Sequence, residues 1–320
     1  RYEWSQRAKA IPELVRLLKQ LALEAKKGGI PLTVDAEESD RLDMSLEIFA
    51  SVYHDTDLSD WEGLGLAVQA YQKRALAVIE KIAELAEQGG KTIAVRLVKG
   101  AYWDTEVKLA QMKGLDEYPV FTRKPSTDLS YVVCAHRLLQ ATPHLYPQFA
   151  THNAYTAASI LVLSKSMRVS QFEFQALQGM GQSLHDYVIA DSDCASPCRI
   201  YAPVGVHEDL LPYLVRRLLE NGANSSFVNQ IAREDADIDD LIQSVADQVQ
   251  GYQEQPRNPH LPLPIDIFAP KRINSKGIEI SDRMAIEALQ QAMMPFSKAQ
   301  WGEKEQTEAG CTTVYNPCNH

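Results

Sequence analysis

The chain has 320 residues, of which 45% are hydrophobic and 23% charged, proportions typical of a soluble globular protein with one large domain or two smaller ones. Its formal net charge of −10 argues against a nucleic-acid-binding surface, which would need clustered basic residues. No apolar run approaches the roughly 20 residues of a membrane span, and the first residues lack the charged-then-apolar layout of a signal peptide. We therefore expect a cytoplasmic protein.

Apolar, strand-like runs alternate with amphipathic helical stretches along the chain. The expected strands cover residues 30–37, 64–70, 92–100, 147–153, 171–179, 198–205 and 226–230. Helical periodicity predicts helices over residues 12–27, 45–54, 70–88 and 127–140, and one more that begins near Glu208 and ends at Gly222. This alternation predicts parallel strands joined by crossover helices.

A doubly wound sheet and a closed (β/α)8 barrel both fit the alternation, but no GxGxxG motif follows an early strand, which counts against a dinucleotide-binding sheet. Nearly every expected strand is apolar until its carboxyl end, where polar groups stand: Asp35, Gln69, Arg96 with Lys99, Thr151 to Asn153, Gln175, Tyr201 and Asn229. Because all strand ends of a barrel meet at one mouth, this favours an α/β fold of the TIM-barrel type. A closed (β/α)8 barrel has eight strands and the sequence predicts seven, so we expect the first barrel strand upstream of Arg1.

Two adjacent arginines, Arg216 and Arg217, interrupt the apolar run of the helix that ends at Gly222. Burying two cations requires anionic partners, because an unpaired buried charge is very costly. Glu220 lies one helical turn from both and supplies one partner. The pair then either grips a bound carboxylate in bidentate fashion or forms a purely structural ion pair.

The five cysteines and eight histidines show no metal-binding pattern. Neither Cys194 with Cys198 nor Cys311 with Cys318 has a second ligand pair at zinc spacing, and no HExxH motif occurs. We expect reduced thiols and no metal site.

Several segments resemble the proline dehydrogenase barrel of the bacterial, FAD-dependent proline utilization A family: VDAEE, RLVKGAYWD, FTRKPSTDLSY, FATHNA, FEFQALQGMG and CRIYAPVG with YLVRRLLENGANSSFVN. The similarity runs in unbroken order over about residues 1 to 250. It implies three regions: a barrel lacking its first strand (1–251), a Pro-rich linker (252–270) and the opening of an aldehyde dehydrogenase domain (271–320). Such an opening segment should lack a core of its own.

The resemblance implies oxidation of L-proline to 1-pyrroline-5-carboxylate by hydride transfer to FAD, with the electrons passed to a membrane quinone. Arg216 and Arg217 would hold the proline carboxylate, and Glu220 would keep that pair in place. Tyr102, Tyr201 and Leu177 would pack around the pyrrolidine ring. Asp35 would act as a hydrogen-bonding or proton-handling group.

Cofactor contacts carry over to Gln69, Arg96, Val98, Gly100, Trp103, Thr122, Arg123, Lys124, Thr151, His152, Asn153 and Gln175. Among them, Arg96 would stabilise negative charge on the reduced flavin ring, and the TRK run would face the pyrophosphate. The FAD would be bound non-covalently, since no cysteine or histidine stands in a matching linkage motif.

The resemblance also names partners and a location. The expected partners are L-proline, the quinone and the remainder of the bifunctional chain. A homodimer is possible under this resemblance, and no nucleic-acid-binding site is expected in this segment. The protein would be cytoplasmic, or peripheral on the inner face of the bacterial membrane.

Three other functions remain open at this stage. Another flavin-dependent barrel shares the architecture but needs no paired-arginine clamp, and an aldolase-type barrel would need a Schiff-base lysine, for which Lys99 is the candidate. A catalytically incomplete scaffold is the third.

Overall fold

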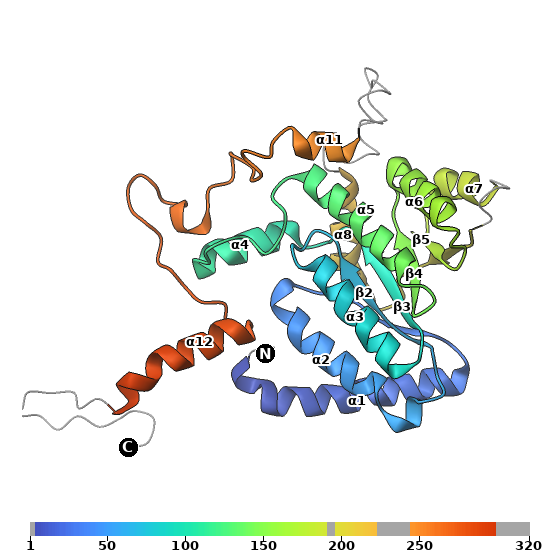
Figure 1. Ribbon diagram of the computed structural model, residues 1–320, viewed down its shortest axis with the longest axis horizontal. Helices are drawn as coiled ribbons and strands as arrows, with labels where there is room; N and C mark the ends of the chain where they lie inside the picture. The colour runs from blue at the N-terminus through green and yellow to red at the C-terminus, as the bar shows by residue number, and fades with distance from the viewer. Residues whose placement is uncertain (1–3, 191–195, 223–243, 299–320) are drawn as a thin grey trace, which may run out of the picture.

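The computed structural model describes residues 4–190, 196–222 and 244–298. Within these residues, six parallel strands form one curled sheet in chain order, which makes a half-barrel (Figure 1). The strands are β1 (Leu32–Val34), β2 (Leu64–Gln69), β3 (Ile93–Val98), β4 (Leu145–Ala150), β5 (Glu173–Leu177) and β6 (Cys198–Tyr201). Each coincides with one of the expected runs, and the parallel α/β class is confirmed. The expected strand 226–230 lies outside the described residues, so closure of the barrel stays a prediction.

Helices follow the strands and cover the outer face of the sheet, where α3 and α5 lie in Figure 1. The α-helices are α1 (Arg7–Gly28), α2 (Leu42–Tyr53), α3 (Ala75–Gly89), α4 (Trp103–Lys113), α5 (Lys124–Gln140), α6 (Ala154–Met167), α7 (Gln182–Ala190), α8 (His207–Gly222), α11 (Val245–Gln250) and α12 (Arg283–Met293). The short 3-10 helices are η1 (Trp4–Gln6), η2 (Ser39–Arg41), η3 (Thr56–Leu58), η4 (Pro264–Asp266) and η5 (Met294–Lys298).

The main core lies between the sheet and the helices, and the pleat of each strand decides which side chains enter it. In β3, Val95 and Leu97 are fully buried against the helices, whereas Arg96 between them points to the inner face. Buried residues of the helices complete this layer, among them Ile79, Ile82, Leu138, Leu139 and Ile160. Polar side chains on the inner face therefore meet inside the half-barrel.

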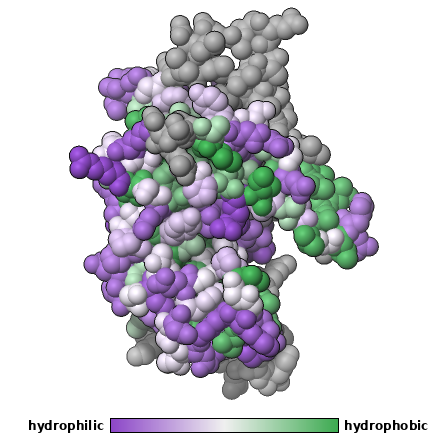
Figure 2. Space-filling model, turned by 90° about the vertical axis from the view of Figure 1, so that its right-hand side faces the viewer, coloured by the Kyte–Doolittle hydropathy of each residue, from purple (hydrophilic) through white to green (hydrophobic). Residues whose placement is uncertain are grey.

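The last strand leaves apolar surface at one edge of the sheet. The side of the molecule on which α6 and α7 lie faces the viewer in Figure 2, where apolar patches reach the surface. Ile200 of β6 is 63% exposed and Val204 after it is 96% exposed. Further parts of the chain could cover such an edge.

The segment after α11 runs along the outside of α4 before it reaches α12 (Figure 1). Hydrogen bonds from side chains to main-chain carbonyls hold it there: the Tyr118 hydroxyl donates to the carbonyl of Pro262 at 2.6 Å, and the side-chain amide of Asn274 donates to the carbonyl of Gln111 at 3.0 Å. The amide of Gly277 donates to the carbonyl of Gly114 at 3.0 Å. At this crossing a Cβ on Gly114 would lie 1.8 Å from the Ser275 oxygen, so the backbones meet only because side chains are absent. No residue of α12 is buried.

Candidate active site

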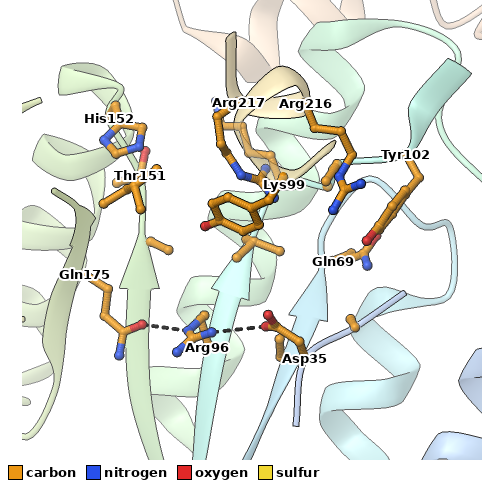
Figure 3. A pocket seen from close by; sticks show the side chains of 18 of the residues that line it. Asp35, Gln69, Arg96, Lys99, Tyr102, Thr151, His152, Gln175, Arg216 and Arg217 are labelled. Atoms are coloured by element: carbon orange, nitrogen blue, oxygen red, sulfur yellow. Dashed lines mark hydrogen bonds and ion pairs between the residues drawn. The ribbon is translucent and has the colours of Figure 1, made fainter. Parts of the chain in front are cut away.

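A cavity of about 280 Å³ lies at the carboxyl ends of the strands, the position expected from the sequence (Figure 3). Most residues named in advance line it: Asp35, Gln69, Arg96, Val98, Gly100, Tyr102, Lys124, Thr151, His152, Asn153, Gln175, Leu177, Tyr201, Arg216 and Arg217. The side chain of Glu220 lies outside the described part of the chain. The structure thus gathers in one place residues that are up to 182 positions apart in sequence, from Asp35 to Arg217.

Arg96 crosses the floor of this cavity and is held from both sides (Figure 3). Its Nη1 donates to Oδ1 of Asp35 at 3.0 Å, and its Nε donates to Oε1 of Gln175 at 2.7 Å. The guanidinium also lies 5.4 Å from the ring centre of Tyr201, within cation–π range. Three different strand ends therefore fix one cation at the bottom of the site.

The paired arginines of α8 enter the cavity from above, next to two tyrosines. The guanidinium of Arg216 lies 5.3 Å from the ring centre of Tyr102, and that of Arg217 lies 4.9 Å from Tyr213. The Nε of Arg216 is buried and finds no hydrogen-bond partner among the described residues. A buried donor without a partner is costly, so this group is suited to an anionic ligand.

Two tyrosines of the cavity keep their protons at neutral pH. Burial, together with the hydrogen bond from the Tyr102 hydroxyl to Glu37 (3.0 Å), raises the pKa of Tyr102 to about 12. Burial also raises the pKa of Tyr201 to about 12. Both therefore act as neutral aromatic walls and hydrogen-bond donors.

His152 is neutral as well. Burial, followed by the neighbouring His185 and Arg217, lowers the pKa of His152 to about 4. Its Nδ1 is buried without a hydrogen-bond partner among the described residues. A neutral imidazole with an unused nitrogen is suited to a hydrogen bond with a ligand rather than to a charge contact.

A second cationic group stands on one wall, where Lys99 and Lys124 both contact the carboxylate of Asp128. Lys124 Nζ lies 2.9 Å from Oδ2 of Asp128, and Lys99 pairs with the other oxygen. Burial alone would raise the pKa of Asp128, but the two ammonium groups outweigh it and lower that pKa. The wall is thus positive by one net charge across these three residues.

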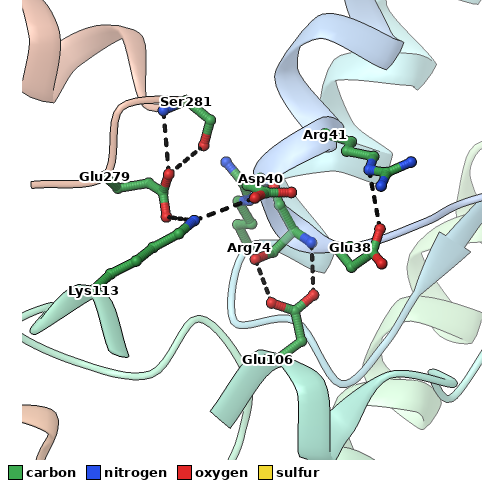
Figure 4. A network of polar contacts seen from close by, with 9 residues as sticks. Glu38, Asp40, Arg41, Arg74, Glu106, Lys113, Glu279 and Ser281 are labelled. Atoms are coloured by element: carbon green, nitrogen blue, oxygen red, sulfur yellow. Dashed lines mark hydrogen bonds and ion pairs between the residues drawn. The ribbon is translucent and has the colours of Figure 1, made fainter. Parts of the chain in front are cut away.

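The loop between β1 and α2, residues 35–41, is fixed from beneath by a network of polar contacts (Figure 4). The buried Glu106 of α4 accepts hydrogen bonds from the backbone N and from Oγ of Ser39, both at 2.6 Å. Lys113 contacts Asp40 of the loop at 3.2 Å and Glu279 of the C-terminal segment at 2.8 Å. The position of Asp35 and Glu37 therefore depends on side chains of α4.

Three residues expected at the cofactor lie elsewhere in the described structure. Trp103 Nε1 donates to the carbonyl of Phe121 at 2.9 Å, and Thr122 Oγ1 accepts from the amide of Asn258 at 3.0 Å. Arg123 donates to the carbonyls of Arg257 (3.0 Å) and Gln255 (3.1 Å). None of the three lines the described cavity, since two of them hold the segment after α11, and their role toward FAD stays a prediction.

Some lining residues were not among the expected site residues. Glu37 follows Asp35 by two positions, so strand alternation could have found it. Tyr213 stands one helical turn before Arg216 and Arg217 and could have been found from helical spacing. Lys99 was noticed at its strand end but not assigned to the cofactor site.

Within residues 4–190, 196–222 and 244–298 no three His, Cys, Asp or Glu side chains are grouped as metal ligands would be. No helix of that part of the chain combines the length and the apolar character that a membrane crossing requires.

Comparison with known proteins identifies the family. The family model described as proline dehydrogenase matches residues 4–230. The bifunctional protein PutA of Salmonella typhimurium is 44% identical over 331 aligned residues, which cover 99% of this chain and 25% of that protein. Proline dehydrogenase 1 of Bacillus subtilis is 29% identical over 215 residues, 66% of this chain and 61% of its own.

The fold agrees with this match. A crystal structure of a mutant proline utilization A from Bradyrhizobium japonicum superimposes with a TM-score of 0.86 and 50% identity, over 92% of this chain and 30% of that chain. The chain spans about a quarter of the length of its bifunctional relatives. The resemblance of the motifs is confirmed, and the chain belongs to the proline dehydrogenase family.

Proposed function

We propose that this part of the protein oxidises L-proline to 1-pyrroline-5-carboxylate with FAD as the electron acceptor. The observation that carries the proposal is the buried Nε of Arg216, which has no hydrogen-bond partner among the described residues and lies beside Arg217 and the neutral Tyr102 at the mouth of a half-barrel. Guanidinium groups bind a carboxylate in bidentate fashion, and neutral aromatic rings pack well on a saturated five-membered ring.

The substrate side of the cavity is built for a small cyclic amino acid. The carboxylate of proline would lie against Arg216 and Arg217, with Tyr102, Tyr201 and Leu177 around the ring. A pocket closed by these side chains excludes longer side chains sterically. Asp35 would hydrogen-bond at the ring side, in a position set by its contact with Arg96.

The donor set on the other side of the cavity fits FAD. Arg96, Lys99 and Lys124 are cations suited to the flavin ring and to phosphate, and the unused nitrogen of neutral His152 can make one more hydrogen bond. Bound FAD would supply the hydride acceptor for Cδ of proline, the carbon next to the nitrogen and away from the carboxylate, while the nitrogen would lose a proton to leave the neutral C=N bond; the electrons would then go to a quinone. Gln69, Val98, Gly100, Thr151, Asn153 and Gln175 would complete the contacts.

The remaining parts of the assembly are proposed on the same family grounds. Residues 1–251 would belong to a barrel of the TIM type, of which six strands lie in the described part of the chain. Residues 271–320 would open an aldehyde dehydrogenase domain in a bifunctional chain, with residues 252–270 as the connection. The protein would be cytoplasmic or peripheral on the bacterial inner membrane, as a monomer or a homodimer.

A flavin spectrum is the direct test. The purified protein should be yellow, should release FAD on acid precipitation, and should lose its visible absorbance when L-proline is added without oxygen. Addition of 2-methylalanine, a carboxylate without the ring, serves as the control and should leave the spectrum unchanged. A flavin-loaded protein that proline does not bleach would refute the proposed reaction.

A further inference from the structure

A second polar cluster lies inside the half-barrel, beneath the cavity floor, and is centred on Glu173 of β5. The side chain of Glu173 is 3% exposed. The carboxylate accepts two hydrogen bonds from Arg199 at 2.8 Å each, one from Gln148 at 2.9 Å and one from Gln175 at 2.8 Å. A buried carboxylate with this many donors is fully satisfied and held in one orientation.

This cluster is continuous with the cation of the active site. Gln175 donates through Nε2 to Glu173 and accepts through Oε1 from Nε of Arg96 at 2.7 Å. The series of contacts therefore runs from Arg199 through Glu173 and Gln175 to Arg96, and ends at Asp35 in the cavity.

The chemistry of the two neighbours allows Gln175 only one orientation. Arg96 can only donate, because a guanidinium has no acceptor. The carboxylate of Glu173 can only accept while it is ionised, and it is: burial raises its pKa, but the bonds from Arg199 and Gln175 outweigh this and lower it. If the amide of Gln175 turned over, its NH2 group would face the arginine and its oxygen would face the carboxylate. Glu173 thus determines which end of Gln175 faces Arg96.

We propose that Glu173, which lies outside the cavity, is a positioning residue: by fixing the amide of Gln175 it holds the guanidinium of Arg96 toward the flavin. This rests on the proposed function, in which Arg96 stabilises the reduced flavin. Arg199 serves as the counter-ion that keeps the buried carboxylate charged. Glu173 contributes no contact to the substrate or cofactor itself, since it does not line the cavity.

The reduction potential of the bound flavin separates this role from a simple charge effect. Glu173→Gln removes a negative charge and leaves Arg199 unpaired, so electrostatics alone would raise the potential. Loss of the hold on Arg96 would lower it, because the cation favours the reduced flavin. The charge-balanced double variant Glu173→Gln with Arg199→Gln removes the electrostatic contribution, and we expect its potential to fall.

Gln175→Leu tests the same connection without changing any charge, and it keeps the pair between Glu173 and Arg199. It should lower the potential by about 30 mV, which corresponds to a tenfold loss of preference for the reduced flavin. Adding the double substitution to Gln175→Leu should produce no further fall, because both act through one contact.

Gln148→Leu is the matched control. Gln148 donates to the same oxygen of Glu173 as Gln175 does, and it is the neighbour of Arg96 across β3 and β4, but among the described residues its side chain forms no hydrogen bond with Arg96. A merely structural cluster predicts that both leucine variants lower the melting temperature and that neither shifts the potential. The positioning role predicts a shift for Gln175→Leu alone.

The potential is measured by chemical reduction against a reference dye, without proline. Unshifted potentials in Gln175→Leu and in the charge-balanced variant would overturn the inference even if proline bleaches the wild-type flavin. Conversely, shifted potentials in a protein that proline does not reduce would overturn only the proposed reaction. If the charge-balanced variant fails to fold, Glu173→Asp decides, because it keeps the charge but shortens the reach to Gln175, which would itself contact the cofactor: the potential should fall, and an unshifted potential would overturn the inference.

Discussion

Replacement of Arg216 by Met separates a substrate clamp from a structural ion pair. Methionine keeps the length of the stem and the helix propensity but removes the charged fork. In the structure the Nε of Arg216 has no hydrogen-bond partner among the described residues, and its visible contact is the ring of Tyr102 at 5.3 Å. Loss of that cation–π contact costs about 0.5–2 kcal/mol, partly offset because a buried cation is removed.

The binding of a carboxylate should respond far more strongly. Breaking a desolvated charge pair costs about 2–5 kcal/mol, which is a loss of affinity of roughly thirtyfold to several thousandfold. The assay is titration of the flavin-loaded protein with a five-membered-ring carboxylate in which oxygen replaces the ring nitrogen, so that no oxidation follows. Flavin content and melting temperature are measured in parallel.

The matched control is Arg283→Met, on the exposed helix α12, which should leave affinity unchanged. If Arg216→Met instead lowers stability by several kcal/mol and leaves the affinity of the remaining folded protein intact, the pair is structural. That result would remove the main support for proline as the substrate.

Three further outcomes are expected. The pKa of His152 is about 4 in the folded chain against an ordinary 6.5, so between these two pH values the unfolded chain binds more protons, and the free energy of unfolding falls as the pH drops from 6.5 to 4. Urea unfolding of His152→Gln at each pH should show a smaller fall, the difference being at most roughly 3 kcal/mol. Glu106→Gln replaces one of the two oxygens that accept hydrogen bonds from Ser39 by a donor, and it should lower the free energy of unfolding by about 1–3 kcal/mol. The control Glu87→Gln, at an exposed helix position, should leave the free energy of unfolding unchanged, and equal free energies of unfolding for the two variants would contradict the role of Glu106. Lys113→Met should speed tryptic cleavage at residues 271–276 without moving the main unfolding transition, and unchanged cleavage would show that backbone contacts alone hold the segment.

The sequence predicted the strands well because each one combines an apolar run with a polar end. In β3 the run from Ile93 to Val98 is interrupted only by Arg96, and that interruption is the inner-face position. The start of α3 was less predictable: the apolar pattern continues back to Ala70, but the helix begins at Ala75, because Gln72 forms a bridge to Val120. A tertiary contact there overrides local periodicity.

The candidate site was predictable where strand ends carry it and less so where loops carry it. Asp35, Arg96 and Gln175 follow from strand alternation, but no local signal shows that Gln175 joins Arg96 to a buried carboxylate on the same strand. The run from Thr122 to Lys124 looked like one phosphate-binding unit. In the structure only Lys124 lines the cavity, since Arg123 donates to backbone carbonyls that lie more than 130 positions later in the chain.

The crossing of Gly114 and Gly277 has a consequence for how this protein can vary in evolution. The C-terminal segment is attached to α4 and its end by the backbone amide of Gly277, by the side-chain amide of Asn274 and by the ion pair between Glu279 and Lys113. Substitutions at positions of that segment other than Asn274, Gly277 and Glu279 should therefore be tolerated more widely. A Cβ atom at either glycine would lie 1.8 Å from a backbone oxygen of the other segment. Both positions should therefore resist replacement, and no second substitution can relieve the clash, because the clashing atom belongs to the backbone. Selection at this junction would thus act on the absence of side chains rather than on their identity.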